Sequence, residues 1–368
     1  IQLAGKLPDD LVDKETFGII TKDQRIGGGM VAAPAFSAFG QIGFRVFYAL
    51  AFALIIPLTV LVWRRVKPGR DWFGLAGGLL LAWNPFVLTV DRLNNNLFAI
   101  PLMLALLALV LDRERRTMTL IMTGVLFGVL AGIRNEAVCF VPAIVYWYLR
   151  SNGLHGFKQR FGQLVLIGVC TVILLTPFLY WKWYAFGHPL MHPSQYPHFQ
   201  GFRPEFYHEF FGSGFCFNGL FNWPLHDTLV RTPHFGYPTY FLFPLVTARA
   251  FGVVGLGLVI LGFAFLWRAK GPVARLLLFW MLPVYLLFGP QENWEEVKMT
   301  FMLLAYPPLA IAFAAGLEGC FQREHRRRRV IALVIVTAAL FGGIRWVGTI
   351  DVPVDERWYQ RFPNAAPG

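Results

Sequence analysis

Long apolar runs recur along the chain, and they constrain its fold more than any other feature of the sequence. A helix needs about 20 apolar residues to cross the hydrocarbon core of a bilayer, so runs of about that length predict membrane-crossing helices. Only 15% of the residues are charged and 56% are hydrophobic, which is far less charge than a soluble domain carries. The sequence therefore predicts an all-α, polytopic membrane protein with about ten transmembrane helices. The ten spans lie roughly at 44–63, 72–90, 97–111, 118–133, 137–149, 162–180, 252–267, 276–290, 299–318 and 330–347.

Basic residues collect in alternate connections between these runs. One set of connections holds 18 of the 33 lysines and arginines, and the positive-inside rule makes that set cytoplasmic. These residues are Arg64, Arg65, Lys67, Arg70, Arg113, Arg115, Arg116, Arg150, Lys158, Arg160, Arg268, Lys270, Arg275, Arg323 and Arg326–Arg329. The short opposite loops hold only Arg92, Arg134 and Lys298. Both termini are then outside, and the net charge of +12 reflects cytoplasmic loops rather than a nucleic-acid partner.

The spans divide the chain into five predicted regions. They are an outer N-terminal loop at 1–43, helices 1–6 at 44–180, an outer loop domain at 181–251, helices 7–10 at 252–347, and an outer tail at 348–368. Loop 181–251 is aromatic and contains six of the eight histidines, so we expect it to be structured at the outer membrane surface. Its histidines leave a divalent metal ion as an alternative, although prolines interrupt the His188–His192 spacing and no HExxH motif is present.

The stretch 131-AGIRNEAVCF-140 places Arg134, Asn135 and Glu136 inside an apolar region that runs from 118 to 147. A single helix of these thirty residues would be about 45 Å long, which exceeds a bilayer core of about 30 Å. Two short helices with a turn at Arg134–Glu136 fit better and keep the basic loops on one side. The turn would be recessed and would line a wet cavity that opens outward. The alternative is an Arg–Glu pair that only caps two helices.

Three segments together resemble a known family. The segment 129-VLAGIRNEAVCFVP-142 resembles the G-L-A-x-L-T-R-P-E-x-L motif of GT-C glycosyltransferases, the polyprenyl-phosphate-sugar users that include protein mannosyltransferases and aminoarabinose transferases. Arg134 and Glu136 occupy the matching places, and Asn135 replaces the proline. The segments 33–50 and 298–317 are similar to the family's Pro-containing loop before its second helix and to its late Y-x-L-P-x-x-P stretch.

The resemblance implies a fold, a location and a reaction. The reaction would transfer a sugar from a polyprenyl-phosphate donor to an acceptor on the outer face of a membrane, which we expect to be the bacterial cytoplasmic (inner) membrane. The family's first helix and the catalytic Asp that follows it would lie upstream of Ile1 or be absent, because the sequence begins within what resembles the first outer loop.

Such a transfer needs a carboxylate that accepts the acceptor's proton and cations that stabilise the leaving phosphate. The candidate carboxylates are Asp91, Glu136 and Asp227. The candidate phosphate-binding cations are Arg134, Lys298, Arg231 and Arg92. No cofactor is implied with certainty. For each of these residues, the competing interpretation is an interfacial charge that anchors a helix end.

Two functional classes remain open at this point. One is the glycosyltransferase, and the other is a non-catalytic scaffold subunit of a larger membrane complex that keeps the GT-C fold. A transporter is a third and weaker alternative.

The charge bias predicts a labelling pattern. A cysteine introduced at Ser194 should react with a membrane-impermeant maleimide added outside intact cells. A cysteine at Gln322, beside the Arg326–Arg329 cluster, should react only after the membrane is permeabilised. The opposite pattern would reverse the topology.

Overall fold

The computed structural model describes residues 26–84, 87, 96–112, 114–150, 154–186, 239–288 and 303–321. Every regular element in this part of the chain is a helix, which confirms the all-α prediction. The elements are α2 (Ile26–Ala53), α3 (Ile55–Val66), α4 (Asp71–Ala82), α6 (Asn96–Val110), α7 (Thr117–Ile133), η2 (Asn135–Phe140), α8 (Val141–Leu149), α9 (Leu154–Phe186), α12 (Thr239–Phe288), η4 (Leu303–Ala305) and α14 (Tyr306–Cys320).

Helix α12 folds back on itself. The hydroxyls of Thr247 and Tyr285 are 2.7 Å apart, whereas 38 residues of straight helix would separate them by about 57 Å. The backbone leaves the helical region at Lys270, where φ is −145° and ψ is 57°. The two arms that meet there correspond to the spans predicted at 252–267 and 276–290.

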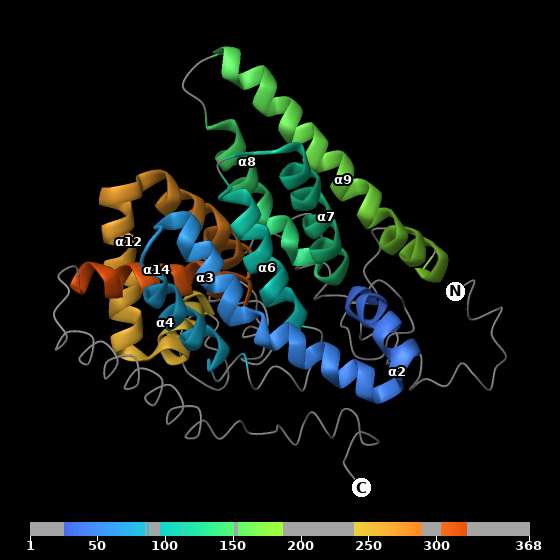
Figure 1. Ribbon diagram of the computed structural model, residues 1–368, viewed down its shortest axis with the longest axis horizontal. Helices are drawn as coiled ribbons and strands as arrows, with labels where there is room; N and C mark the ends of the chain where they lie inside the picture. Colours follow the sequence, from blue (N-terminus) through green and yellow to red (C-terminus); the bar gives the residue numbers. More distant parts are fainter. Residues whose placement is uncertain are drawn as a thin grey trace, which may run out of the picture.

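Helix α14 is the centre of the bundle. Its span is 89% buried, and it lies between α12 and the α3–α4 pair (Figure 1). Glycines allow the neighbouring helices to approach α14 closely. A Cβ at Gly77 of α4 would come within 2.7 Å of the Ala310 carbonyl oxygen, and one at Gly262 of α12 would overlap Ala312. Close approach of backbones at small residues is the usual way in which membrane helices associate.

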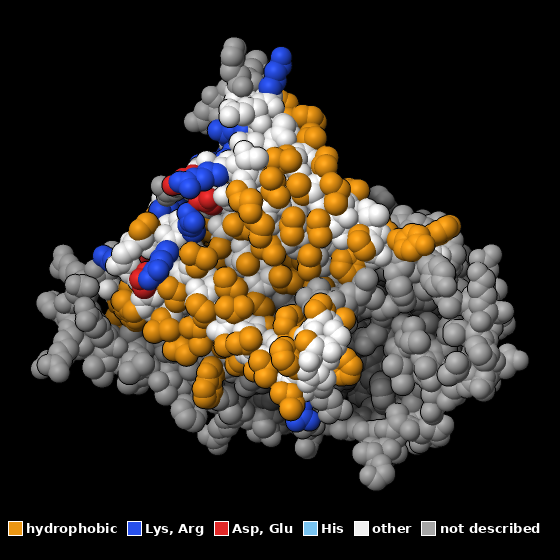
Figure 2. Space-filling view, turned by 45° about the vertical axis from the view of Figure 1, so that its right-hand side comes forward, with side chains coloured by type: hydrophobic (Ala, Val, Ile, Leu, Met, Phe, Trp, Pro, Cys, Tyr) orange, Lys and Arg blue, Asp and Glu red, His pale blue; other side chains and the backbone are white. Residues whose placement is uncertain are grey.

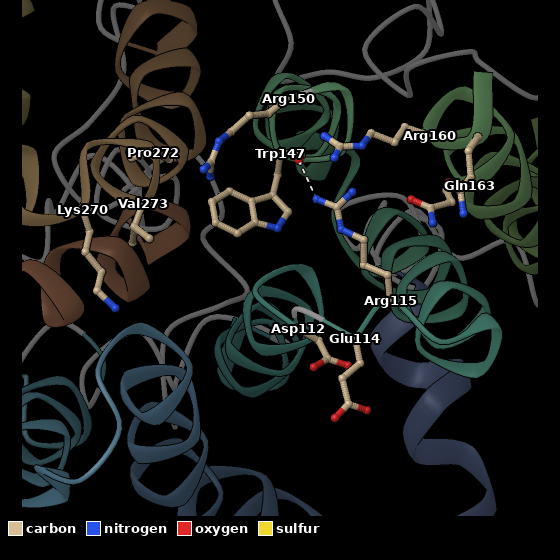
Figure 3. A pocket seen from close by; sticks show the side chains of 11 residues that line it. Asp112, Glu114, Arg115, Trp147, Arg150, Arg160, Gln163, Lys270, Pro272 and Val273 are labelled. Atoms are coloured by element: carbon tan, nitrogen blue, oxygen red, sulfur yellow. Dashed lines mark hydrogen bonds between the residues drawn. The ribbon is translucent and has the colours of Figure 1, made fainter. Parts of the chain in front are cut away.

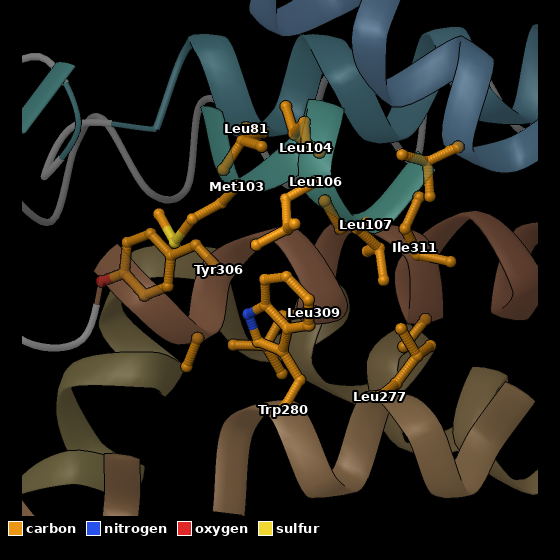
Figure 4. Close-up of a cluster of buried hydrophobic side chains, with 14 of the residues drawn as sticks. Leu81, Met103, Leu104, Leu106, Leu107, Leu277, Trp280, Tyr306, Leu309 and Ile311 are labelled. Carbon is orange, nitrogen blue, oxygen red and sulfur yellow. The ribbon is translucent and has the colours of Figure 1, made fainter. Parts of the chain in front are cut away.

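A cluster of large apolar side chains fills the space around α14 (Figure 4). Trp280 of α12 and Leu309 of α14 lie at its middle, with Met103 and Leu106 of α6 on the other side. Trp280 also donates a hydrogen bond from Nε1 to the Leu304 carbonyl oxygen, 3.3 Å away. This bond satisfies the indole N–H inside the apolar core and fixes the start of α14 against α12.

Helix α9 lies at the periphery and contacts α7 along a row of glycines. The row is Gly124, Gly128 and Gly132, spaced four residues apart, and each faces α9. The Thr171 hydroxyl of α9 donates to the Gly124 carbonyl oxygen at 3.1 Å. Only 6% of the α9 span is buried, so its remaining apolar surface is available to lipid. Figure 2 shows a broad area of hydrophobic side chains on one face of the described residues, with charged side chains grouped along its edge.

Four segments are long and apolar enough to cross a membrane, and four shorter apolar helices accompany them. The long segments are Arg45–Val66, Gly156–Tyr180, Phe251–Leu286 and Leu303–Cys320. The shorter ones are Asp71–Ala82, Ala99–Val110, Thr117–Ile133 and Glu136–Leu149. These helices indicate an integral membrane protein. The total of about ten spans stays a prediction, and the span expected at 330–347 lies outside the described residues.

The first predicted span is a broken helix. Helix α2 includes residues well before position 44 and breaks at Gly40, whose φ of 58° suits glycine. Leu54 then separates α2 from α3. Most of the predicted outer loop 181–251 and all of the predicted tail 348–368 lie outside the described residues. The boundaries of these two regions stay predictions.

The connections that carry the basic residues meet at one end of the bundle. Glu318, near the end of α14, forms salt bridges with Lys67 at 2.6 Å and Arg70 at 3.1 Å. Arg65 pairs with Asp112 at 2.5 Å. The Lys270 ammonium donates to the Val66 carbonyl oxygen. We call this the basic end, and its grouping agrees with the predicted alternation of loops; which side of the membrane it faces stays a prediction.

The glycine row on α7 predicts a position-dependent effect of adding one methyl group. Gly128→Ala should destabilise the protein by about 1–3 kcal/mol, because its Cβ would meet backbone and side chain of α9. The contacts that it meets are the Thr171 carbonyl oxygen at 2.7 Å and the Leu174 Cβ at 2.9 Å. Thermal unfolding in detergent would measure the loss.

Gly168→Ala is the matched control, since nothing lies within 4 Å of its Cβ position. Alanine favours a helix over glycine by about 1 kcal/mol, so this variant should be neutral or slightly more stable. Equal shifts in the two variants would contradict the packing of α7 against α9.

Candidate functional site

The charged turn begins where α7 ends. Arg134 is in an extended conformation, with φ −138° and ψ 111°, and its N–H still donates to the Leu130 carbonyl oxygen at 2.7 Å. The next six residues form the 3₁₀ helix η2. Proline contributes to the tight winding at the end of η2, because Pro142 has no N–H to give to the Val138 carbonyl, and the Val141 N–H bonds to that carbonyl instead. Helix α8 then starts with Pro142 in its first turn, where proline is well tolerated.

The chain reverses direction at this turn. Arg115, just before α7, donates from Nη2 to the Trp147 carbonyl oxygen at 3.1 Å, and its guanidinium lies 5.0 Å from the Tyr148 ring centroid. A straight helix would place residues 32 positions apart about 48 Å from each other. The structure therefore confirms the prediction of two short helices with a turn at Arg134–Glu136.

Arg134 is the buried charge of this turn. Its side chain is 0% exposed, and Nε lies 3.4 Å from Oε2 of Glu136, which is 16% exposed. Charge-assisted N–H···O contacts are usually about 2.7–2.9 Å long, so this ion pair is a loose one. The structure therefore contains the Arg–Glu pair of the alternative interpretation, and the outward-opening wet cavity stays a prediction.

The turn packs against the bundle at the end opposite the basic end. Phe140 of η2 stacks on Trp280 of α12, with ring centroids 4.2 Å apart. Trp280 in turn bonds to Leu304, just before α14. The 3₁₀ helix that follows Arg134 therefore packs against the second arm of α12, which in turn contacts the start of α14.

Of the seven candidate site residues, the structure describes and brings together Arg134 and Glu136. The other five, Asp91, Arg92, Asp227, Arg231 and Lys298, lie outside the described residues. The outer loops that would border a cavity at Arg134 also lie outside them. Asp91 and Arg92 follow the α4 segment, and Lys298 precedes η4 by five positions.

A metal site is not evident in the part of the chain that the structure describes. Within it, no three His, Cys, Asp or Glu side chains are grouped closely enough to hold a metal ion. The six histidines of loop 181–251 lie outside this part, so the alternative of a divalent ion there stays a prediction.

The sequence indicates a role only in the topology for four further cations, Arg115, Arg150, Arg160 and Lys270. In the structure these four residues line one pocket at the basic end. The sequence feature that could have indicated the pocket is the presence of a cation in each of several successive loops. Only the fold shows that these loops meet.

Comparison with known proteins supports the family resemblance. A model of the family described as dolichyl-phosphate-mannose-protein mannosyltransferase matches residues 29–181. No curated protein and no solved structure matches the chain. The matched stretch contains Asp91, Arg92, Arg134 and Glu136, whereas Asp227, Arg231 and Lys298 lie beyond it. Over residues 29–181, the chain is thus similar to the dolichyl-phosphate-mannose-protein mannosyltransferases, a family of membrane glycosyltransferases of the GT-C type.

Proposed function

We propose that the chain is a GT-C membrane glycosyltransferase that takes a sugar from a polyprenyl-phosphate donor and transfers it to an acceptor at the outer face. The observation that carries this proposal is Arg134. It is a fully buried arginine at a break between two membrane helices, inside the stretch that matches the mannosyltransferase family.

The position of Arg134 suits a phosphate that leaves with a growing negative charge. A guanidinium can contact two phosphate oxygens at once, and its charge has most effect where water is excluded. The contact between Arg134 Nε and Glu136 is 3.4 Å long, which is longer than a usual charge-assisted hydrogen bond of about 2.7–2.9 Å. A phosphate with two suitably placed oxygens would compete with it well.

The surface beside this turn suits the donor's hydrocarbon tail. Val138 is 61% exposed and Val141 is 38% exposed, and both follow Arg134 by less than three helical turns. In a membrane these side chains would face lipid. A donor lying there would have its phosphate near the arginine while its tail stays in the bilayer.

The remaining roles fall to residues outside the described part of the chain. Glu136 already neutralises Arg134, so Asp91 and Asp227 are the stronger candidates for the base that accepts the acceptor's proton. Arg92, Arg231 and Lys298 would add positive charge around the phosphate. The expected location is a bacterial cytoplasmic membrane, with both termini outside.

The Arg134–Glu136 contact also favours a second candidate. If the pair serves only to close the turn, the chain is a non-catalytic scaffold subunit that retains the fold. The two candidates differ in whether a lipid phosphate is needed at Arg134.

Removing the pair in two steps separates these candidates. Arg134→Gln should destabilise the protein by about 3 kcal/mol, because it leaves Glu136 without its cation. The double variant Arg134→Gln/Glu136→Gln should recover most of this stability. Under the proposal, this stable double variant should still be labelled at least tenfold less than the wild type by a photoreactive polyprenyl phosphate in detergent.

Arg275→Gln provides the control for losing one arginine charge. Arg275 is exposed, near the turn of α12 at the basic end, and its variant should be labelled like the wild type. Wild-type labelling of the stable double variant would remove Arg134 from the donor site. A wild-type protein that takes no label at all would favour the scaffold.

A further inference from the structure

A second polar site lies at the opposite end of α8 from Arg134. It is a pocket of about 730 Å³ at the basic end. Its cations come from four separate elements: Arg115 precedes α7, Arg150 follows α8, Arg160 belongs to α9, and Lys270 is at the turn of α12. The six residues of η2 and the nine of α8 place it about 25 Å from Arg134.

Three of these cations surround the last turn of α8. Arg115 donates to the Trp147 carbonyl oxygen, and the Arg150 guanidinium lies 5.3 Å from the Trp147 ring centroid. Figure 3 shows the guanidinium groups of Arg115 and Arg160 pointing toward one another. Like charges repel at such short range, so this arrangement favours a bound anion.

The two carboxylates of the pocket are engaged by other partners. Asp112 is 2.5 Å from Arg65 and accepts a hydrogen bond from Thr119 at 3.1 Å. Glu114 is 2.6 Å from Arg116. Both carboxylates are turned away from the guanidinium groups of Arg115 and Arg160 (Figure 3).

No carboxylate of the described residues forms a salt bridge with the three arginines Arg115, Arg150 and Arg160. The electrostatic consequence is visible at Arg115, which is half-buried. Its pKa is lowered, first by burial and then by the nearby charges of Arg160 and Arg150. A guanidinium stays charged despite such a shift, so the cluster remains cationic.

We propose that this pocket binds a phosphate-bearing anion. Its guanidinium groups can each contact two phosphate oxygens, and Trp147, Pro272 and Val273 offer an apolar wall to the rest of the ligand. The phosphate belongs either to an anionic phospholipid headgroup of the adjacent leaflet or to a soluble phosphate compound. The proposal is independent of the glycosyltransferase assignment, because it rests on the other end of the bundle.

The test uses Arg160→Gln in the full-length chain. Arg160 forms no salt bridge or side-chain hydrogen bond with the described residues, so its replacement should not unfold the protein. Lys158→Gln is the matched control. It removes one positive charge from the same helix, two positions away, and Lys158 does not line the pocket. Circular dichroism and thermal unfolding would establish that both variants fold, and Arg150→Gln replaces Arg160→Gln if that variant does not.

Two probes distinguish the sources of the phosphate. The first probe is the anionic lipid phosphatidylglycerol, whose retention by the protein is compared with that of phosphatidylcholine by native mass spectrometry. The other is pyrophosphate, titrated against thermal stability in neutral detergent. The wild type should bind at least one of them, and Arg160→Gln should weaken that binding about tenfold, as expected for the loss of one charge-assisted contact. Lys158→Gln should bind within about twofold of the wild type.

The pattern of binding identifies the ligand or overturns the site. Selective retention of phosphatidylglycerol assigns the pocket to a lipid headgroup, and a response to pyrophosphate alone assigns it to a soluble phosphate. Equal weakening in Arg160→Gln and Lys158→Gln would show only a general effect of charge and would overturn the proposal. Wild-type affinity in Arg160→Gln, or no binding of either probe to the wild type, would also overturn it.

Discussion

The reversal of the chain at Arg134 is the constraint on which the rest of the structure depends. Without it, residues 118–147 would form one helix, and every later connection would change sides. The reversal is built from an extended arginine, a 3₁₀ segment and Pro142, and it leaves Arg134 buried beside Glu136. The buried charge is tolerated because the Glu136 carboxylate is next to it, and Phe140 of the same turn packs against Trp280 of α12.

Two chemically different ends follow from that reversal. One end gathers the basic connections, where Glu318 links Lys67 and Arg70 and where the arginine pocket forms. The other end holds Arg134, and the bundle between them is apolar and joined through small residues such as Gly77 and Gly128. Our two proposals place one anion site at each end, and the two ends are separated by the length of α8 and η2.

The sequence predicts the helices better than it predicts the sites. Apolar length and the alternation of basic loops are local properties, so the helical hairpins about Arg134 and Lys270 could be inferred correctly. The pairing of Arg134 with Glu136 was foreseen as an alternative because the two residues are neighbours. The pocket at the basic end was not foreseen, since Arg115, Arg150 and Arg160 are brought together by the packing of α7, α8 and α9, and no local pattern records that packing.

The distance across the reversal tests this account most directly. Spin labels at Met118 and Leu149, in a variant without the native cysteines, should give a double electron–electron resonance distance below about 25 Å, because both sites are at the basic end. A distance near 46 Å, which 31 residues of continuous helix would give, would contradict the reversal. It would also contradict the burial of Arg134 and the arginine pocket at the basic end.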